Sequence, residues 1–304
     1  MTAPTCVGID LAWGTKARTG IAVLADDGRL AASTSVVSDA EISAFLDEQA
    51  SGRVVAAIDA PLIVVNETGR RACEAELGRD FQAYHAGAHT SNLAKPWFNP
   101  QPRGALLAAS LNWSLNPAVR PNAATSVAIE VYPHPAMVSL FELDRVIPYK
   151  NKRGRDLAAL KAAFDELMNH MERVLDATLD LRGSRRWSLL RATAADASRK
   201  VDLGRIEDEV DAIFCAYLAW LWANDRQALR VYGDYASGYI VTPPPPDVPA
   251  RRTVAERDSR GDQTGALDAL AALFLAAKPD LTGHEARALA SIARSHLGVV
   301  DVQS

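Results

Sequence analysis

Short apolar runs separated by turn residues are the dominant pattern of the first sixty residues, and they predict strands. Four runs have the length of a strand: 5–10, 19–25, 29–37 and 53–59. The Asp-Asp-Gly sequence at 26–28 predicts a hairpin between the second and third strands. Residues 39–50 carry the apolar stripe of a helix, with Ser38 or Asp39 as its N-cap. Because a helical crossover joins parallel strands, we expect a three-stranded meander whose first strand lies parallel to the fourth.

Helical patterns dominate after residue 60. A polar insertion around 62–124, rich in Gly, Pro and Asn, contains helical stretches near 67–78 and 103–112. One more apolar strand is expected at 125–131, where a Tyr-Pro pair ends it. Two longer segments have apolar residues at helical spacing: 155–178 and 205–224. With a short strand before the prolines that begin at 243, the pattern predicts an α/β fold, a mixed sheet flanked by helices.

The C-terminal sixty residues differ in composition from the rest of the chain. We expect residues 1–242 to form one α/β domain that contains the insertion. Residues 243–262, rich in proline and then in charge, predict a linker. Residues 263–304 predict a helical appendage that packs on the core or on a partner. Thr282 and Glu285 fit a capping box at the start of its second helix.

Composition and charge limit the classes of function. Hydrophobic residues make up 48% of the 304 residues, which excludes a disordered chain. The three cysteines are scattered and form no CxxC pair, so neither a zinc site nor a disulfide framework is expected. With no leader-like N-terminus and no apolar run of about 18 residues, we expect a cytoplasmic protein without membrane contact. The net charge of −4 means that nucleic-acid binding would need local basic patches.

Acidic residues follow three of the predicted core strands. Asp10 and Asp59 end the first and fourth strands, and Glu130 lies near the end of the strand at 125–131. Neighbouring parallel strands bring their C-terminal residues to one edge of a sheet, where open α/β sheets have their sites. A single carboxylate at a strand end often only caps the next turn. The same position on three core strands favours a shared site.

A fourth acid lies on the apolar face of the helix predicted at 205–224. Asp211 precedes Phe214 by three residues and Leu218 by seven, so it lies on or beside the buried face, with Asp208 one turn earlier. An ionised carboxylate there is costly unless it is paired or bound to a cation. A favourable interaction of first-turn acids with the helix dipole is the other interpretation, and it accounts for residues 207–209 better than for Asp211.

Clustered carboxylates repel each other, and a hard divalent cation relieves that repulsion. Mg²⁺ and Mn²⁺ prefer oxygen ligands and keep exchangeable waters. Two such ions about 4 Å apart activate a water and stabilise the leaving oxygen of a phosphodiester. No Ser-His-Asp or Cys-His arrangement is evident in the chain. Metal-assisted hydrolysis with Mg²⁺ or Mn²⁺, in a two-ion site, is therefore the chemistry that these residues favour.

Five segments resemble the domain-of-unknown-function 429 family: GIDLAWG (8–14), IDAPL (58–62), IEVYPH (129–134), PYKNKRGR (148–155) and DEVDAIFCAYLA (208–219). The resemblance covers about residues 5–242, and the order and spacing of the segments carry it. Proteins of this family are regarded as predicted nucleases, so the resemblance implies nuclease chemistry on a ribonuclease-H-like fold.

The resemblance also implies roles for individual acids. The acidic metal-binding positions of the family correspond to Asp10, Asp59, Glu130 and Asp211, with Asp208 accompanying the last. The Asp208–Asp211 pair is also similar to the D-x-x-D pair on the last helix of Holliday-junction resolvases. The family helix often begins with adjacent aspartates, whereas a glutamate follows Asp208 in this chain.

Basic and aromatic residues near these segments are candidates for contacts with a nucleic acid. Six basic side chains could hold phosphates: Arg70, Arg71, Lys150, Lys152, Arg153 and Arg155. A solvated basic surface is the other interpretation of the same residues. Trp97 and Phe98 fit either a base-stacking pair or a loop anchor, and Trp187, beside three arginines, fits a stacking role. His134 fits either a proton shuttle or a structural histidine.

Three functions remain open on the sequence. The first is a divalent-metal-dependent nuclease acting on DNA or RNA. The second is a sugar-kinase-like nucleotide-binding phosphotransferase, since those enzymes share the strand-strand-strand-helix-strand unit, although no second glycine-rich adenosine motif is evident. The third is a non-catalytic ribonuclease-H-like module that binds a protein partner, or a second copy of itself, through the C-terminal helices.

Overall fold

The computed structural model divides the chain into two units, 1–250 and 251–304. It describes residues 3–120 and 124–251, and within the C-terminal unit residues 270, 271, 273–278, 282, 284–286, 288, 289 and 292. In that unit the described residues 273–277 and 284–286 are helical. The backbone N–H of Thr282 donates to Glu285 Oε2 at 2.9 Å, and the N–H of Glu285 donates to Thr282 Oγ1 at 3.3 Å. The predicted capping box is therefore confirmed.

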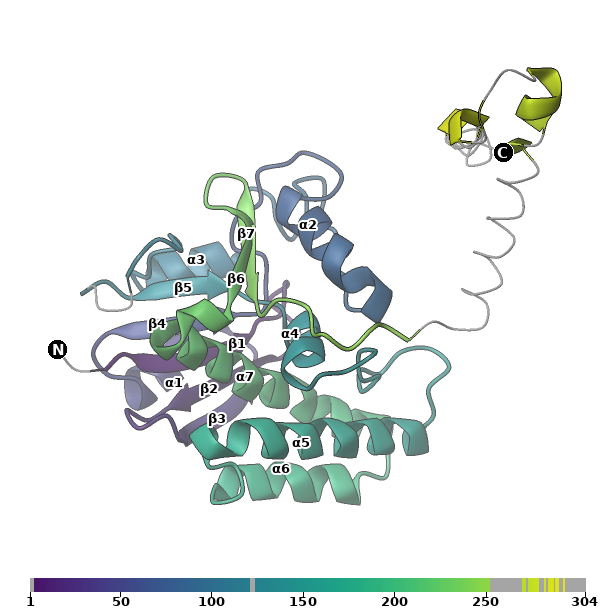
Figure 1. Cartoon of the computed structure of the whole chain (residues 1–304). Helices are drawn as coiled ribbons and strands as arrows, with labels where there is room; N and C mark the ends of the chain where they lie inside the picture. The colour runs from purple at the N-terminus through teal and green to yellow at the C-terminus, as the bar shows by residue number, and fades with distance from the viewer. Residues whose placement is uncertain are drawn as a thin grey trace. The chain divides into compact units, whose positions relative to one another are not determined.

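The first unit is built on a mixed five-stranded sheet (Figure 1). Its strands are β1 (Thr5–Asp10), β2 (Thr19–Leu24), β3 (Leu30–Val36), β4 (Val54–Ile58) and β5 (Val127–Glu130). Their order across the sheet is β3-β2-β1-β4-β5. The first three strands pair antiparallel, whereas β4 lies parallel to both β1 and β5. The predicted meander and the parallel crossover strand are confirmed.

Helices cover both faces of this sheet, as the alternation of side chains along β1 requires. Val7 and Ile9 belong to a core that includes α1 (Asp39–Gln49) and α3 (Arg103–Ser110). Cys6 lies in a larger core on the opposite face, built with the long helices α5 (Leu157–Leu179) and α7 (Lys200–Asn224). Ser38 is the N-cap of α1, and its hydroxyl accepts from the backbone N–H of Glu41.

Helix α7 lies directly against the centre of the sheet, because two glycines remove the side chains that would separate them. A Cβ at Gly8 on β1 would overlap the backbone of Ala212, and one at Gly20 on β2 would overlap the backbone of Asp208. The helix begins at Lys200, more than a turn before the predicted start at 205. The acids at 207–209 are therefore in the body of the helix, and the prediction that they are first-turn acids is wrong.

Two helices went unpredicted, α4 (Pro133–Leu140) and α6 (Arg185–Asp196). The α4 sequence contains two prolines, but Pro133 occupies the first helical position, where its missing N–H removes no hydrogen bond. Helix α6 packs against α5 and α7, and Trp187 is buried there with its Nε1–H donating to Glu172 at 2.9 Å. The sequence predicted a base-stacking role for Trp187, and that prediction is wrong because the ring is buried.

A β-hairpin and helix α2 (Ala72–Phe81) form the remaining layer of the unit (Figure 1). The hairpin pairs β6 (Arg230–Asp234) with β7 (Gly238–Thr242), and a bridge between Val131 and Val241 connects it to the end of β5. Two 3₁₀ turns, Gln82–Tyr84 and Arg226–Ala228, follow α2 and α7 respectively.

The first residues of the predicted linker belong to this unit. The hydroxyl of Tyr84 donates to the carbonyl of Val248 at 2.8 Å, and Ala250 packs against the core beneath α2. Residues 252–262 of the predicted linker lie outside the described residues. Among the described helices, none is long and apolar enough to cross a membrane.

Candidate functional site

Four aspartates meet where β1 and β4 end beneath α7. Asp10 is the last residue of β1, and Asp59 follows β4, with its backbone N–H donating to Ile9 O at 2.8 Å. The close contact at Gly8 and Gly20 brings Asp208 and Asp211 of α7 to the same edge. The negative charges of Asp211, Asp59 and Asp208 all raise the pKa of Asp10, as expected for carboxylates within a few ångströms of each other. We call these four residues the carboxylate cluster.

Lys150 supplies the positive charge of the carboxylate cluster. Its Nζ lies 2.5 Å from Asp211 Oδ2 and 3.8 Å from Asp10 Oδ2, and it also pairs with Glu207 at 3.1 Å. The hydroxyl of Tyr149 donates to the other oxygen of Asp211 at 2.8 Å. Lys150 was predicted to contact substrate phosphate, but here it is the counter-ion of the acids.

Burial makes this cluster difficult to ionise completely. It raises the pKa of Asp59 to about 7 and that of Asp208 to about 7, against the opposing charge of Lys150. Burial also raises the pKa of Asp10 well above its usual range. The surrounding carboxylates outweigh burial at Lys150 and raise the pKa of its ammonium, so it stays charged. Near neutral pH the cluster therefore has a deficit of positive charge that an additional cation would relieve.

The chemistry of these donors suits a hard divalent cation. Oδ2 of Asp10 and Oδ2 of Asp211 are buried, and the ammonium of Lys150 is the polar group paired with each of them, at 3.8 and 2.5 Å. Oxygen atoms in this state are the ligands that Mg²⁺ and Mn²⁺ prefer. Within the part of the chain that the structure describes, no three His, Cys, Asp or Glu side chains are already arranged to hold a metal ion. Binding would therefore require the side chains around Lys150 to rearrange.

Glu130 does not join the carboxylate cluster, although it ends the neighbouring strand. Both of its oxygens accept from the guanidinium of Arg71, at 2.6 and 2.9 Å, and Leu62 N–H donates to it at 2.8 Å. Glu130 is buried, and its acceptors are used by these donors. Glu130 therefore has a structural role, and the prediction that it is a catalytic metal ligand is corrected.

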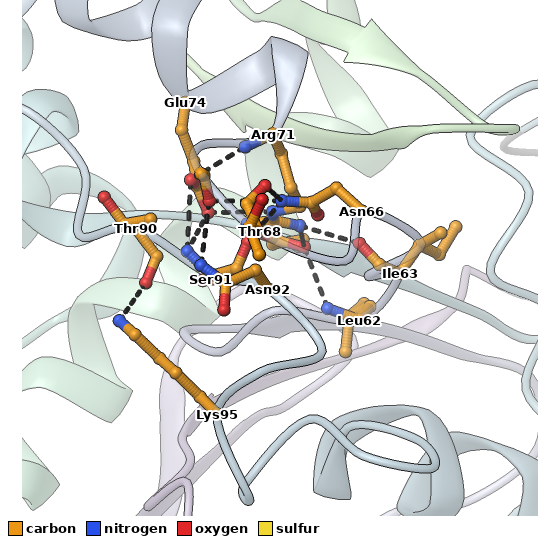
Figure 2. Close-up of polar contacts among 12 residues, drawn as sticks. Leu62, Ile63, Asn66, Thr68, Arg71, Glu74, Thr90, Ser91, Asn92 and Lys95 are labelled. Atoms are coloured by element: carbon orange, nitrogen blue, oxygen red, sulfur yellow. Dashed lines mark hydrogen bonds and ion pairs between the residues drawn. The ribbon is translucent and has the colours of Figure 1, made fainter.

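Arg71 is likewise structural. Its guanidinium also donates to Glu74 at 2.8 Å and to the carbonyl of Ile63 at 2.9 Å, and the residue is only 3% exposed (Figure 2). The prediction that Arg71 contacts substrate phosphate is corrected on this ground: its charge is consumed by two buried carboxylates. We call Arg71, Glu74 and Glu130 the buried ionic network.

The other predicted basic residues lie at the surface. Arg70 is exposed, as are Lys152 and Arg153, which follow Lys150 in the same loop. Arg155 is half-buried, and its guanidinium donates to the carbonyl of Lys150 at 2.6 Å, which fixes the loop. Lys152 and Arg153 are therefore the members of this group whose position and exposure suit contact with a phosphate backbone.

Two contacts of the site were not predicted from the sequence: Glu207, which pairs with Lys150, and Tyr149, which donates to Asp211. Glu207 had a usable signal, because it precedes Asp211 by four residues and so shares its helix face. Tyr149 had none, since its contact spans 62 positions of the chain. His134 is half-buried beside Tyr132, whose hydroxyl lies 3.2 Å from Nδ1, and burial and the charge of Lys150 lower its pKa to about 3. A histidine this weakly basic is neutral at pH 7 and a poor proton shuttle.

Comparison with known proteins identifies the family. A family model described as "Protein of unknown function (DUF429)" matches residues 8–237. The chain belongs to the DUF429 family. The matched residues include all four aspartates of the carboxylate cluster, Lys150 and the whole of the buried ionic network, and they stop before the unit 251–304. No curated protein and no solved structure matches the chain.

Proposed function

We propose that this DUF429 protein is a divalent-metal-dependent phosphodiesterase that hydrolyses nucleic acids, on a ribonuclease-H-like fold. The observation that carries this proposal is the meeting of four aspartates at one sheet edge, where the ammonium of Lys150 is the positive charge that pairs with Asp10 and Asp211. Such an arrangement is costly for stability, so a functional reason for it is expected.

The sheet supports the fold part of the proposal. An antiparallel meander followed by two parallel strands, in the order β3-β2-β1-β4-β5, agrees with the ribonuclease-H-like sheet that the sequence resemblance implies. In this arrangement β1 is central and pairs with β4, and α7 packs against it, so Asp10 at the end of β1 lies beside Asp59, which follows β4. The acids thus come from two adjacent parallel strands and one helix.

Within the carboxylate cluster, Asp10, Asp59 and Asp211 are the residues that would hold Mg²⁺ or Mn²⁺, with Asp208 beside them. A bound divalent ion would supply Lewis-acid stabilisation of the charge that develops on phosphoryl oxygens. Tyr149 orients Asp211 by its hydrogen bond. Lys150 balances the negative charge of Asp211 and Asp10.

The decisive experiment compares cleavage of labelled single-stranded, duplex and branched oligonucleotides with Mg²⁺, with Mn²⁺ and with EDTA. We expect cation-dependent cleavage by the wild type and a loss of about 100-fold or more in Asp10→Asn and Asp211→Asn, the range seen when a group that stabilises transition-state charge is removed. Asp47→Asn, which changes an exposed acid on α1, is the matched control and should cleave like the wild type.

A second measurement does not depend on turnover. Mn²⁺ should raise the melting temperature of the wild type and of Asp47→Asn, and should raise it less in Asp10→Asn, because binding to the folded state stabilises it. Equal responses in all three proteins, together with no cleavage of any substrate, would contradict the metal site.

The alternatives give different results in the same assays. A sugar-kinase-like protein would be stabilised by a nucleoside triphosphate with Mg²⁺. The described residues contain one five-stranded sheet and one hairpin, with no second copy of the strand-helix unit that such kinases use. A non-catalytic module would respond to neither metal nor nucleotide.

A further inference from the structure

Aromatic side chains gather on one side of the carboxylate cluster. The ring of Trp13 lies 5.1 Å from that of Phe98, 6.4 Å from that of Trp97 and 6.5 Å from that of His89. Phe98 is 1% exposed and anchors the group, so the anchor interpretation of the sequence applies to it. Trp97 is 50% exposed, which is unusual for the largest apolar side chain. We call Trp13, His89 and Trp97 the aromatic platform.

The platform adjoins the acids. Trp13 and His89 line a small cavity of about 40 Å³ together with Asp59 and Tyr132. Trp13 also follows Asp10 by only three residues, in the loop that leaves β1. A molecule that lies on the exposed rings would therefore be close to Asp59 of the carboxylate cluster.

The loop that carries His89 and Trp97 is held by the buried ionic network (Figure 2). The backbone N–H of Ser91 donates to both oxygens of Glu74, at 3.0 and 3.1 Å. Asn92 donates to the carbonyl of Gly69 at 2.9 Å, and the ammonium of Lys95 donates to the carbonyl of Thr90. Glu74 is fixed by Arg71, which also holds Glu130. The platform is therefore formed before any ligand binds, which lowers the entropic cost of binding.

Positive charge lies beside the exposed rings. The Nζ of Lys95 is 6.0 Å from the centre of the Trp13 ring. Burial lowers the pKa of His89, and the charges of Lys152 and Lys95 lower it further, so both lysines lie close to this ring. Lys152 belongs to the exposed loop that also carries Lys150. Aromatic rings with lysines around them are the combination that holds a base by stacking and its backbone by charge.

We propose that the aromatic platform binds an unpaired nucleobase of a single-stranded nucleic acid, stacked on the exposed ring of Trp97 with the tilted ring of Trp13 at its edge, and with the backbone directed past Lys95 and Lys152 to the carboxylate cluster. This inference rests on the proposed function and narrows its substrate class to single strands or unpaired regions. A base inside a duplex has both faces covered by its neighbours, so it cannot offer a face to these rings.

The test is a binding titration in EDTA, where metal-dependent cleavage does not interfere. Fluorescence anisotropy would follow labelled single-stranded DNA, single-stranded RNA and duplex DNA of the same sequence. The proteins are the wild type, Trp97→Ala, Trp97→Phe and the control Tyr235→Ala, which removes an aromatic side chain of nearly the same exposure, 51% against 50%, from the turn between β6 and β7. Thermal melting checks that all four are folded.

We expect the wild type to bind a single strand more tightly than the duplex. Comparison of single-stranded DNA with single-stranded RNA shows which sugar is favoured. Trp97→Ala should weaken single-strand binding by about 5- to 100-fold, the range for loss of one stacked base. Trp97→Phe should recover most of that loss, and Tyr235→Ala should bind like the wild type. Absent or unselective single-strand binding, or wild-type affinity in Trp97→Ala, would overturn the platform.

Failure of this inference and failure of the proposed function are separable. Trp97-dependent binding without cleavage in any cation would support base binding by the platform and contradict the proposed hydrolase. The opposite outcome is that Trp97→Ala binds and cleaves single strands like the wild type, with the same dependence on the cation. That result would support the proposed hydrolase and contradict base binding by the platform. If Trp97→Ala changes only duplex affinity, the exposed ring has a different partner and the inference is wrong.

Discussion

Asp59 and Glu130 end neighbouring parallel strands, yet their carboxylates have different surroundings. Glu130 meets the guanidinium of Arg71, which reaches it from the start of α2, and its charge is neutralised in a buried ion pair. Asp59 has no arginine, and it faces Asp211 and Lys150. The difference arises from one side chain twelve positions beyond Asp59, so strand-end position alone does not decide which acid belongs to a site.

At the level of single residues, Arg71 gives a sharp prediction for stability. Arg71→Met would leave Glu74 and Glu130 buried without a counter-charge, and we expect the free energy of unfolding to fall by about 3–5 kcal/mol. Urea denaturation followed by circular dichroism measures this. Arg70→Met, at the exposed neighbouring position, should change it by less than about 0.5 kcal/mol. Equal effects at the two positions would refute the structural role of Arg71.

Asp59 predicts how stability depends on pH. Its pKa is raised from 3.8 to about 7 by burial, so the folded protein keeps a proton that the unfolded chain has released between about pH 4 and 7. The contribution to stability is complete below pH 4 and is lost as pH rises to 7, with a slope of at most about 1.4 kcal/mol per pH unit for this proton. Asp59→Asn cannot titrate and should flatten the profile.

Urea midpoints measured at intervals from pH 4.5 to 7.5 would show the difference between Asp59→Asn and the wild type. Asp47→Asn is the control, because that exposed side chain should leave the slope unchanged. Parallel profiles for Asp59→Asn and the wild type would mean that Asp59 is ionised throughout this range in the folded protein.

At the level of elements, the position of α7 depends on the two glycines below it. The helix lies so close to β1 and β2 that the peptide groups of residues 208 and 212 occupy the space of a side chain. Backbone atoms cannot rotate away as a flexible side chain can. The close approach is therefore what brings Asp208 and Asp211 of the helix within reach of Asp10.

Substitution of these glycines should separate the helix from the sheet. Gly20→Ala places a methyl group on the backbone of Asp208, and we expect a loss of about 3 kcal/mol or more in stability and a weaker Mn²⁺ response. Gly204→Ala, in the same helix but with open space around it, should instead stabilise by about 0.5–1 kcal/mol, since alanine favours helix. Thermal and urea unfolding measure both variants. We expect the free energy of unfolding to fall in Gly20→Ala and to rise in Gly204→Ala.

At the level of the whole molecule, every residue that we assign to the site lies in the first unit. Residues 1–250 contain the sheet, both of its helical faces, the carboxylate cluster and the aromatic platform, and the family match lies within them. The prolines that begin at 243 complete this unit, since Val248 accepts a hydrogen bond from Tyr84.

A chain ending at Ala250 should therefore fold and respond to Mn²⁺ like the full-length protein, with a similar melting temperature. A chain ending at Thr242 loses the contacts of Val248 and Ala250, and its free energy of unfolding should be lower by about 1–2 kcal/mol. Circular dichroism and the Mn²⁺-induced melting shift measure both. Loss of the cation response in the 1–250 chain would show that the second unit contributes to the site.

The amino-acid sequence by itself determined six of the seven described strands, with β6 unpredicted, as well as most of the helices and the edge at which acids would gather. These features follow from local rules, because apolar periodicity shows which face of an element is buried and the last residue of a strand lies at the sheet edge. Asp10, Asp59 and Asp211 could be found in this way. The two helices that went unpredicted begin with a proline or carry many charges, so their own sequences gave a weak helical signal.

Only the tertiary structure decided which charges are paired. Lys150 and Arg71 looked alike in the sequence as basic residues near acidic segments, but Lys150 pairs with the carboxylate cluster and Arg71 belongs to the buried ionic network. The exposure of Trp97 beside buried Phe98 was equally hidden. Such partnerships join residues about 60 positions apart, and they depend on how loops fold over a sheet edge, for which sequence periodicity contains no information.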